Sequence, residues 1–424
     1  MTIDWAARVA EHLDAESAAQ LVRELVRIPS VSGSDAECEI QAWLADWLRA
    51  EGFEVDHWRL PLEELTSQPD FPGMEVSRSE AWGVVARLPG SGGGRSLLLN
   101  GHVDVVPPGD RQAWGDDPFS GRLDGDAVYG RGACDMKGGL AAAMLALRAL
   151  RRSGVRLAGD VLLAGVAGEE DGGLGTYALL RRGWRADACV ITEPTGLDVV
   201  PANGGALTFR LTVRGQSAHA SRRTEGVSAI EKFYPVFRAL RDLERRRSAD
   251  ADPLMARWNV PYPIEIGTVT AGDWSSSVPD LLVAEGRFGV ALGESVDAAR
   301  RVLEAAVAEA CAADPWLSEH PVTVEWWGGQ FASARLPKDA EWLSEAVHKA
   351  HRTVTGEAAD TWGGPYGSDL RLMTGIGGVP TVQYGPGDID LAHAPNERVS
   401  VTEVLTAART VSLTALDLCG PVTE

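Results

Sequence analysis

The sequence is short of basic residues and of long apolar runs, and each shortage excludes a class of partner. Its 424 residues include 40 Lys and Arg against 60 Asp and Glu, a formal charge of −20 at pH 7. Such an acidic chain repels both a phosphate backbone and an anionic membrane surface, so we expect neither nucleic acid nor membrane as a partner. No stretch approaches the roughly 18 apolar residues that cross a bilayer. The N-terminal segment is typical of an amphipathic helix rather than a signal peptide.

Cysteine is also scarce, and its spacing excludes a disulfide framework. The five residues are odd in number and scattered, with no C-x-x-C pair, a pattern typical of reduced thiols in a cytoplasm. Cys134 lies inside a motif described below, where we interpret it as a small buried apolar residue.

What the sequence does contain is the alternation of an α/β protein. Between about residues 81 and 194, strand-like runs such as "SLLLNGHVDVV", "DVLLAGVAG" and "ACVITEP" alternate with helical patterns. After Asn203 the order becomes β-α-β-β-α-β, that of a ferredoxin-like sandwich, and the α/β pattern returns from about Gly328 with the strand "PTVQYGPG". We therefore predict a catalytic domain in two parts, residues 1–203 and 327–424, interrupted by a smaller α+β domain, residues 204–326. Residues 61–79 are predicted to form a surface loop.

The predicted strands of the α/β part end in potential metal ligands or general bases. Each of these residues alone has a common structural interpretation, such as a helix N-cap or a solvated acid. Together they suggest a two-metal site, because several carboxylates are buried side by side only at high cost unless cations compensate them. In open α/β sheets, ligands bind at this carboxyl edge. The candidates are His102, Asp104, Asp135, Glu169, Glu170, Asp171, Glu193 and His393.

The spacing within the motifs agrees with this hypothesis. His102 and Asp104 share a face, so His102 can ligate through one ring nitrogen while Asp104 accepts the N–H of the other. Glu169 and Glu170 are neighbours that cannot both point at one ion, so one can ligate while the other stands over the attacking water. Nitrogen and oxygen donors without thiolate fit Zn²⁺ at a catalytic site, and Mn²⁺ or Co²⁺ would also fit.

Six segments in consistent order carry a resemblance to a known family. "GHVDVVP", "GRGACDMKGG", "GEEDGG", "ITEP", "GQSAHAS" and "LAHAPNE" resemble the M20 metallopeptidases and deacylases, which include acetylornithine deacetylase, succinyl-diaminopimelate desuccinylase, aminoacylase-1 and the glutamate carboxypeptidases. The resemblance runs from about Ile28 to the C-terminus. It implies a zinc-peptidase-like catalytic domain with a mixed sheet, interrupted by a ferredoxin-like lid that mediates dimerisation in many members, and hence a homodimer.

The resemblance also implies a role for each metal ligand. His102 and Glu193 would hold one zinc ion, Glu170 and His393 the second, and Asp135 would bridge the two. The peptide bond after Asp135 would be cis, as in relatives.

Three further residues receive catalytic roles from the same resemblance. Asp104 would orient His102, and Glu169 would be the general base that passes a proton from water to the leaving amine. His219, in "GQSAHAS", would stabilise the oxyanion, often from the partner subunit; without the resemblance it is simply a polar histidine at a strand end.

Substrate recognition is less determined by the sequence. Arg371, in "GSDLR", matches a segment where relatives bind a substrate carboxylate, and its alternative role is a surface or structural ion pair. Ser276 stands where many relatives carry Asn, and Gly289 or Val290 where many carry Arg, with Arg287 out of register. These departures argue against a substrate that is recognised in the way relatives recognise succinyl-diaminopimelate or a C-terminal glutamate. The residues of "GDWSSSVP", "GPYGSDLR" and "YGPGDIDLAHAPNE" are more similar to those of deacylases described as acetylornithine deacetylase-like, some of which act on N-formyl amines.

We therefore expect a dizinc amidohydrolase that removes an acyl group from an N-acyl amino acid or a related amine. One alternative is a dipeptidase or carboxypeptidase that uses the same site. Another, from a different class, is a non-catalytic binding protein on the same fold, which is disfavoured because binding alone does not require the base Glu169.

Overall fold

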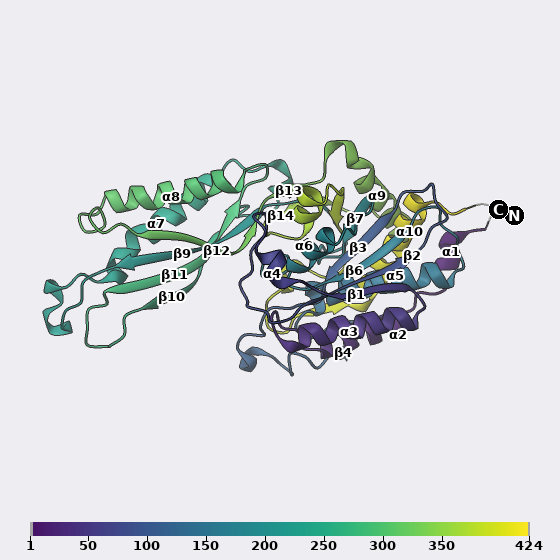
Figure 1. The fold of residues 1–424 in the computed structure, drawn as a ribbon, viewed down its shortest axis with the longest axis horizontal. Helices are drawn as coiled ribbons and strands as arrows, with labels where there is room; N and C mark the ends of the chain where they lie inside the picture. Colours follow the sequence, from purple (N-terminus) through teal and green to yellow (C-terminus); the bar gives the residue numbers. More distant parts are fainter. Residues whose placement is uncertain (1–2, 423–424) are drawn as a thin grey trace. The chain divides into compact units, whose positions relative to one another are not determined.

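The structure, a computed structural model, describes residues 3–422 and divides into two compact units (Figure 1). The first unit contains the residues up to 201, together with 335–362 and those from 369 onward. The second contains residues 202–334 and 363–368. Each unit is described below by itself.

The first unit is built on a mixed sheet with the strand order β1-β2-β6-β3-β7-β15-β8-β13, and β14 beside β8. β3 pairs in parallel with β6 and β7, and β7 in parallel with β15, whereas the β1–β2, β2–β6 and β15–β8 pairings are antiparallel. The strands are β1 (Glu54–Arg59), β2 (Trp82–Leu88), β3 (Leu97–His102), β6 (Val161–Val166), β7 (Ala188–Ile191), β8 (Val199–Asn203), β13 (Ala334–Arg335), β14 (Thr361–Gly364) and β15 (Thr381–Gln383).

One apolar core joins this sheet to most of the helices. Leu97 and Leu99 of β3 belong to it, and so do buried residues of α2, α3, α5, α9 and α10. α6 packs on β2 and β6, and its buried leucines lie outside this core. The helices are α1 (Trp5–Ala10), α2 (Ala15–Arg27), α3 (Asp35–Ala50), α4 (Leu62–Thr66), α5 (Gly138–Arg152), α6 (Leu174–Arg181), α9 (Glu341–Thr355) and α10 (Val401–Cys419). The mixed α/β fold class predicted from the sequence is confirmed.

The central strands are buried on both faces, which explains their continuous apolar sequence. Every residue of β3, "LLLNGH", and of β6, "VLLAGV", is buried, as is usual for parallel strands covered by helices. α5 is buried along most of its length, and its Ala and Gly residues allow close packing on the sheet. A Cβ on Gly139 would lie 1.7 Å from the carbonyl oxygen of Thr192, just beyond β7, so only glycine fits there.

Two features of this unit were not anticipated. β4 (Arg122–Asp124) and β5 (Ala127–Tyr129) form a hairpin that pairs with β16 (Arg398–Ser400). α10, with more than half of its residues buried, packs on α5 and α9. Residues 61–79 form the predicted loop but include α4, and the side chain of Arg78 near their end is buried.

The second unit has the predicted β-α-β-β-α-β order. Its sheet runs β10-β11-β9-β12, with all three pairings antiparallel. α7 and α8 pack against each other and share a separate apolar core with the sheet. The elements are β9 (Gly205–Arg214), α7 (Ala229–Ser248), β10 (Ile264–Ala271), β11 (Leu281–Val290), α8 (Val296–Ala312) and β12 (Thr323–Phe331).

Within residues 3–422, we find no helix with the length and apolar character that a membrane crossing requires.

Candidate metal centre

The parallel strands of the first unit bring the predicted ligands to one edge of the sheet. His102 is the last residue of β3, Glu169 and Glu170 follow β6, Glu193 follows β7, and His393 lies beyond β15. Because parallel strands point the same way, their carboxyl ends meet at this edge. Asp135 is in the turn that precedes α5.

The His102 ring has its Nε2 atom turned into the cluster. Nε2 lies 3.1 Å from Oδ1 of Asp135 and 4.0 Å from Oε2 of Glu193. Nδ1 lies 2.8 Å from the backbone oxygen of Asp104, which can only accept, so Nδ1 carries the hydrogen. This hydrogen bond leaves the lone pair of Nε2 for a cation.

The carboxylate of Asp104 does not accept the ring N–H of His102, as the sequence analysis predicted it would. Its carboxylate is 3.8 Å from Nδ1 of His102, so the backbone oxygen, rather than the carboxylate, receives the ring N–H. The carboxylate instead accepts the backbone N–H groups of Glu169, at 3.2 Å, and Glu170, at 3.3 Å, together with the Ser32 hydroxyl at 3.0 Å. The fully buried Asp104 therefore joins the end of β3 to the turn that bears the two glutamates.

His393 completes the other side of the cluster. Its Nε2 lies 3.1 Å and 3.2 Å from the two carboxylate oxygens of Glu170 and 3.5 Å from Oδ2 of Asp135. Asp135 thus lies between the two histidines, one oxygen facing each, as a bridging ligand requires. The peptide bond from Asp135 to Met136 is cis, as the resemblance implied.

The pKa values of these groups shift in the directions expected for a crowded cation site. Burial alone would lower the pKa of His102, but the hydrogen bond that its ring donates to Asp135 and the charge of Glu193 raise it well above its usual value. The charge of Glu170 raises the pKa of His393 to about 11. Burial and neighbouring negative charges raise the pKa of Glu193 and of Glu169 well above the usual range.

The donor set fits divalent cations. Ligand atoms of His102, Asp135 and Glu170 all lie within 4.8 Å of one another, and so do those of His102, Glu169 and Glu193. The histidine and carboxylate donors are those that zinc and similar cations accept at catalytic sites. Buried carboxylates at such separations repel one another unless cations lie between them.

The side chains of Glu169 and Glu193 are both buried, and neither carboxylate accepts a hydrogen bond from any residue between 3 and 422. Glu193 lies 4.0 Å from Nε2 of His102, whereas Glu169 forms no ion pair with any residue in that range. The nearby charge of Asp369 contributes to its raised pKa. A carboxylate of raised pKa without a protein partner suits proton transfer to and from a bound water or substrate.

Buried arginines that the sequence analysis did not single out support this centre. Arg131 forms an ion pair with Glu397, and Arg78 one with both Glu37 and Asp171. Arg131, Glu397 and Asp171 lie inside three of the quoted motifs, which is the local signal for these pairs. Their partners are remote in sequence, so periodicity could not pair them.

Arg371 lies near the turn that bears Glu169 and Glu170, and its side chain is buried. Its Nη2 donates to the backbone oxygen of Gly172 at 2.6 Å, and its Nη1 lies 4.0 Å from Asp369. Only 4% of the side chain is exposed. These contacts favour the structural ion pair, the second of the two roles considered for this residue.

His219 and Ser276 lie in the second unit, next to each other on its surface. The backbone N–H of Ala220 donates to the oxygen of Ser276 at 2.8 Å, and both His219 and Ser276 are exposed. Nδ1 of His219 accepts the backbone N–H of Ser221 at 3.2 Å, which leaves the ring hydrogen on Nε2 in the neutral form. The ring can therefore donate a hydrogen bond from Nε2, and the contact of either residue with substrate stays a prediction.

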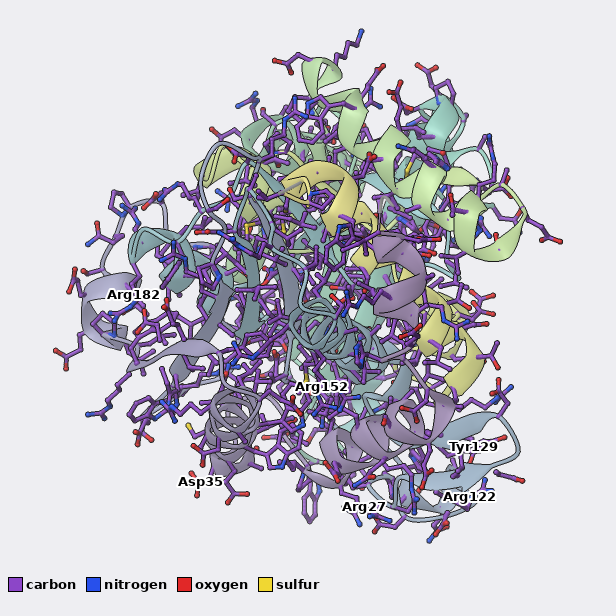
Figure 2. The ribbon with its side chains drawn as sticks, turned by 90° about the vertical axis from the view of Figure 1, so that its right-hand side faces the viewer. Arg27, Asp35, Arg122, Tyr129, Arg152 and Arg182 are labelled. Atoms are coloured by element: carbon purple, nitrogen blue, oxygen red, sulfur yellow. The ribbon has the colours of Figure 1, made fainter. Side chains whose placement is uncertain are left out.

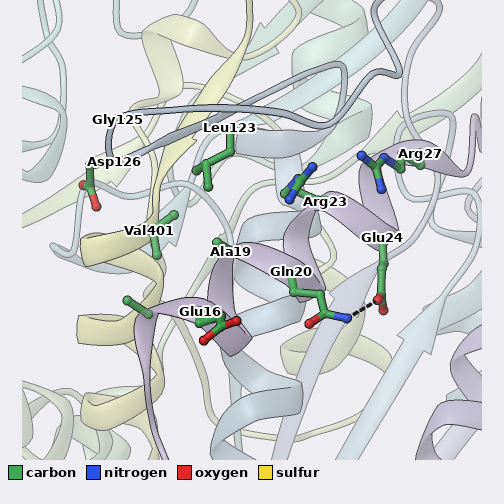
Figure 3. Close-up of a pocket in the computed structure, with 11 residues that line it drawn as sticks. Glu16, Ala19, Gln20, Arg23, Glu24, Arg27, Leu123, Gly125, Asp126 and Val401 are labelled. Atoms are coloured by element: carbon green, nitrogen blue, oxygen red, sulfur yellow. Dashed lines mark hydrogen bonds between the residues drawn. The ribbon is translucent and has the colours of Figure 1, made fainter.

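A pocket of about 570 Å³ lies elsewhere in the first unit, between α2 and the β4–β5 hairpin (Figure 3). It is lined by Arg23, Arg27, Leu123 and their neighbours, and none of the predicted site residues belongs to it. It is therefore separate from the metal centre.

Comparison with known proteins identifies the family. The sequence model of peptidase family M20/M25/M40 matches residues 98–417, which include all the predicted metal ligands. The chain therefore belongs to this family. It is an enzyme that hydrolyses linear amide bonds, and members of the family depend on metal ions for this reaction.

Similar proteins include both deacylases and peptidases. The chain is 28% identical to an N-formyl-4-amino-5-aminomethyl-2-methylpyrimidine deformylase of Halalkalibacterium halodurans, over 96% of each chain. It is also 28% identical to the acetylornithine deacetylase of Proteus mirabilis, over 90% of this chain and 92% of that protein. Among solved structures, the di-peptidase Dug1p of Saccharomyces cerevisiae shares the fold, with a TM-score of 0.77 at 15% identity, covering 96% of this chain and 97% of that one.

Proposed function

We propose that the protein is a dizinc deacylase that removes an acyl group from an N-acyl amino acid or a related N-acyl amine. The convergence of His102, Asp135 and Glu170 beside the buried carboxylate of Glu169, which accepts no hydrogen bond from residues 3–422, carries this proposal. A binding protein would not need a buried carboxylate of raised pKa at this place.

In this proposal, two metal positions share Asp135. His102 and Glu193 would hold one ion, and Glu170 and His393 would hold the other. Nitrogen and oxygen donors favour zinc, with Co²⁺ or Mn²⁺ as replacements. When bound, these ions would supply Lewis-acid chemistry, which lowers the pKa of water from near 15.7 to about 7 and polarises an amide carbonyl.

The chain's own residues move the proton and hold the developing charge. Glu169 accepts the proton of the attacking water and returns it to the nitrogen of the leaving amine. His219 donates its Nε2 hydrogen to the oxyanion, a contact whose loss typically costs about 10²–10³ in rate. We propose that the second unit is the lid that brings His219 and Ser276 to the substrate, and that it mediates homodimerisation in a cytoplasmic enzyme.

Deacylation is favoured over peptide cleavage by the relatives that align over nearly the whole chain. Both the deformylase and the deacetylase, by their names, remove a small acyl group from an amine. The dipeptidase likeness lies at 15% identity and concerns the fold alone.

The test is a substrate screen with product identification. Formyl-, acetyl-, succinyl- and long-chain acyl-amino acids and formylated amines are incubated beside a dipeptide panel, with and without chelator. We expect turnover of one acyl class, release of the free acid and the amine, and loss of turnover with chelator that zinc restores. Turnover confined to dipeptides would replace the deacylase proposal with the peptidase alternative.

A further inference from the structure

A buried ion pair outside the proposed ligand set joins two of the ligand-bearing segments. Nη1 of Arg131 lies 2.6 Å from Oε2 of Glu397, and the two side chains are 2% and 0% exposed. Arg131 follows β5, and Glu397 directly precedes β16. Removing two charges from water is costly, and a pair buried so completely must be matched by further hydrogen bonds.

Glu397 makes those hydrogen bonds to the segment that carries Asp135. Its Oε1 accepts the backbone N–H of Cys134 at 2.9 Å and that of Asp135 at 3.0 Å. The position of the Asp135 backbone, and with it the proposed bridging carboxylate, is therefore tied to Glu397.

Arg131 makes the matching bonds to the segment that carries His393. Its Nη2 donates to the backbone oxygen of His393 at 3.1 Å, and its Nη1 donates to that of Ala394 at 3.4 Å. His393 has a φ of 60°, in the left-handed region, which a residue with a Cβ keeps only where its surroundings hold it. The planar guanidinium reaches Glu397 and the His393 backbone at once because its donors point in different directions.

We propose that Arg131 and Glu397 are positioning residues that set the separation of Asp135 and His393, and thereby the affinity of the metal position that these two ligands share with Glu170. The proposal rests on the proposed function, since it assumes that this position binds a cation. Neither residue touches the cation or the substrate; each acts through the backbone of a ligand.

Arg131→Lys is the discriminating variant. A lysine keeps a positive charge beside Glu397, but its single ammonium group does not reproduce the fork that also reaches the His393 backbone. Glu397→Gln keeps an oxygen for the N–H groups of Cys134 and Asp135 while it removes the charge that holds Arg131. The control is Arg122→Lys, on the hairpin shown in Figure 2, where the arginine is exposed and pairs with Asp124.

Zinc is titrated into each metal-free protein by calorimetry, and thermal unfolding of the metal-free proteins is recorded beside it. We expect Arg131→Lys to weaken one of the two zinc affinities by about 10–100-fold and to leave the other unchanged. The variant should resemble a milder form of His393→Ala, and excess zinc should restore its turnover. Glu397→Gln should weaken the same position, and the control should match the wild type.

Other results would overturn the inference. Wild-type affinity at both positions in Arg131→Lys would show that the ion pair does not position the ligands. Equal weakening of both positions, with lower thermal stability of the metal-free variant, would show a general structural role. If the wild type binds fewer than two zinc ions, the proposed function fails first, and this inference fails with it.

Discussion

Replacing Arg78 measures how much its ion pairs stabilise the turn that bears Glu169 and Glu170. Its guanidinium donates to Glu37 at 2.8 Å and 3.0 Å and to Asp171 at 2.8 Å, and the three side chains are at most 6% exposed. Asp171 directly follows Glu170 and also accepts the backbone N–H of Val76, so the triad fastens residues 75–78 to the turn. Replacing Arg78 with Met leaves two buried carboxylates without their cation.

The expected loss of stability follows from the broken pairs. Removing one partner of a buried ion pair costs about 3–5 kcal/mol, which corresponds to a fall in Tm of roughly 6–20 °C for a unit of a few hundred residues. Arg87→Met is the matched control, since Arg87 also lies 2.8 Å from a carboxylate, that of Asp160, but is 40% exposed. Exposed pairs contribute at most about 1 kcal/mol.

The pH dependence of this loss identifies its cause. Burial already raises the pKa of Glu37, and the hydrogen bond from Arg78 opposes that rise. Without Arg78 the folded-state pKa of Glu37 rises further, and a raised carboxyl pKa stabilises the fold at low pH and loses that stabilisation as pH increases. The deficit of Arg78→Met, measured by calorimetry of the metal-free protein, should therefore be smaller at pH 5 than at pH 8. A deficit equal to that of Arg87→Met, or one independent of pH, would refute this reasoning.

Two further predictions concern packing and metal loading. Gly139→Ala should strongly lower the yield and Tm of folded protein, because its Cβ would overlap the backbone oxygen of Thr192; Gly375→Ala, with nothing within 4 Å of its Cβ, is the control, and equal Tm values would contradict the prediction. Zinc loading near pH 7 should release protons, because the charge of Glu170 raises the pKa of His393 to about 11 and a ligating histidine must be neutral. Zinc affinity should then rise about tenfold per pH unit for each proton released, as calorimetry in buffers of different ionisation enthalpy would show, and a pH-independent affinity would exclude it.

The sequence predicted those parts of the site that depend on local pattern. The apolar runs of β3, β6 and β7 identify buried parallel strands, and parallel strands place His102, Glu170 and Glu193 at one edge whatever surrounds them. The β-α-β-β-α-β order of the second unit could also be predicted from local pattern, because the sequence of each element has its own periodicity.

What the sequence did not predict depends on contacts between distant segments. Arg78 reaches Glu37 across 41 residues, and Arg131 reaches Glu397 across 266, so no local pattern pairs them. The role of Asp104 depends on which of its oxygens faces His102, a detail of strand-end geometry that residue spacing does not determine. The largely buried α10 was missed because it lacks the one-sided apolar stripe of a surface helix.

The most direct test of the central claim compares zinc content and turnover of the wild type with those of Glu169→Gln. We predict about two zinc ions per chain in both proteins and a kcat lowered by about 10²–10⁴ in the variant, because the amide keeps the shape of Glu169 but does not accept the proton. Wild-type turnover in Glu169→Gln, or a wild type that binds no zinc, would contradict a metal-activated water with Glu169 as its base.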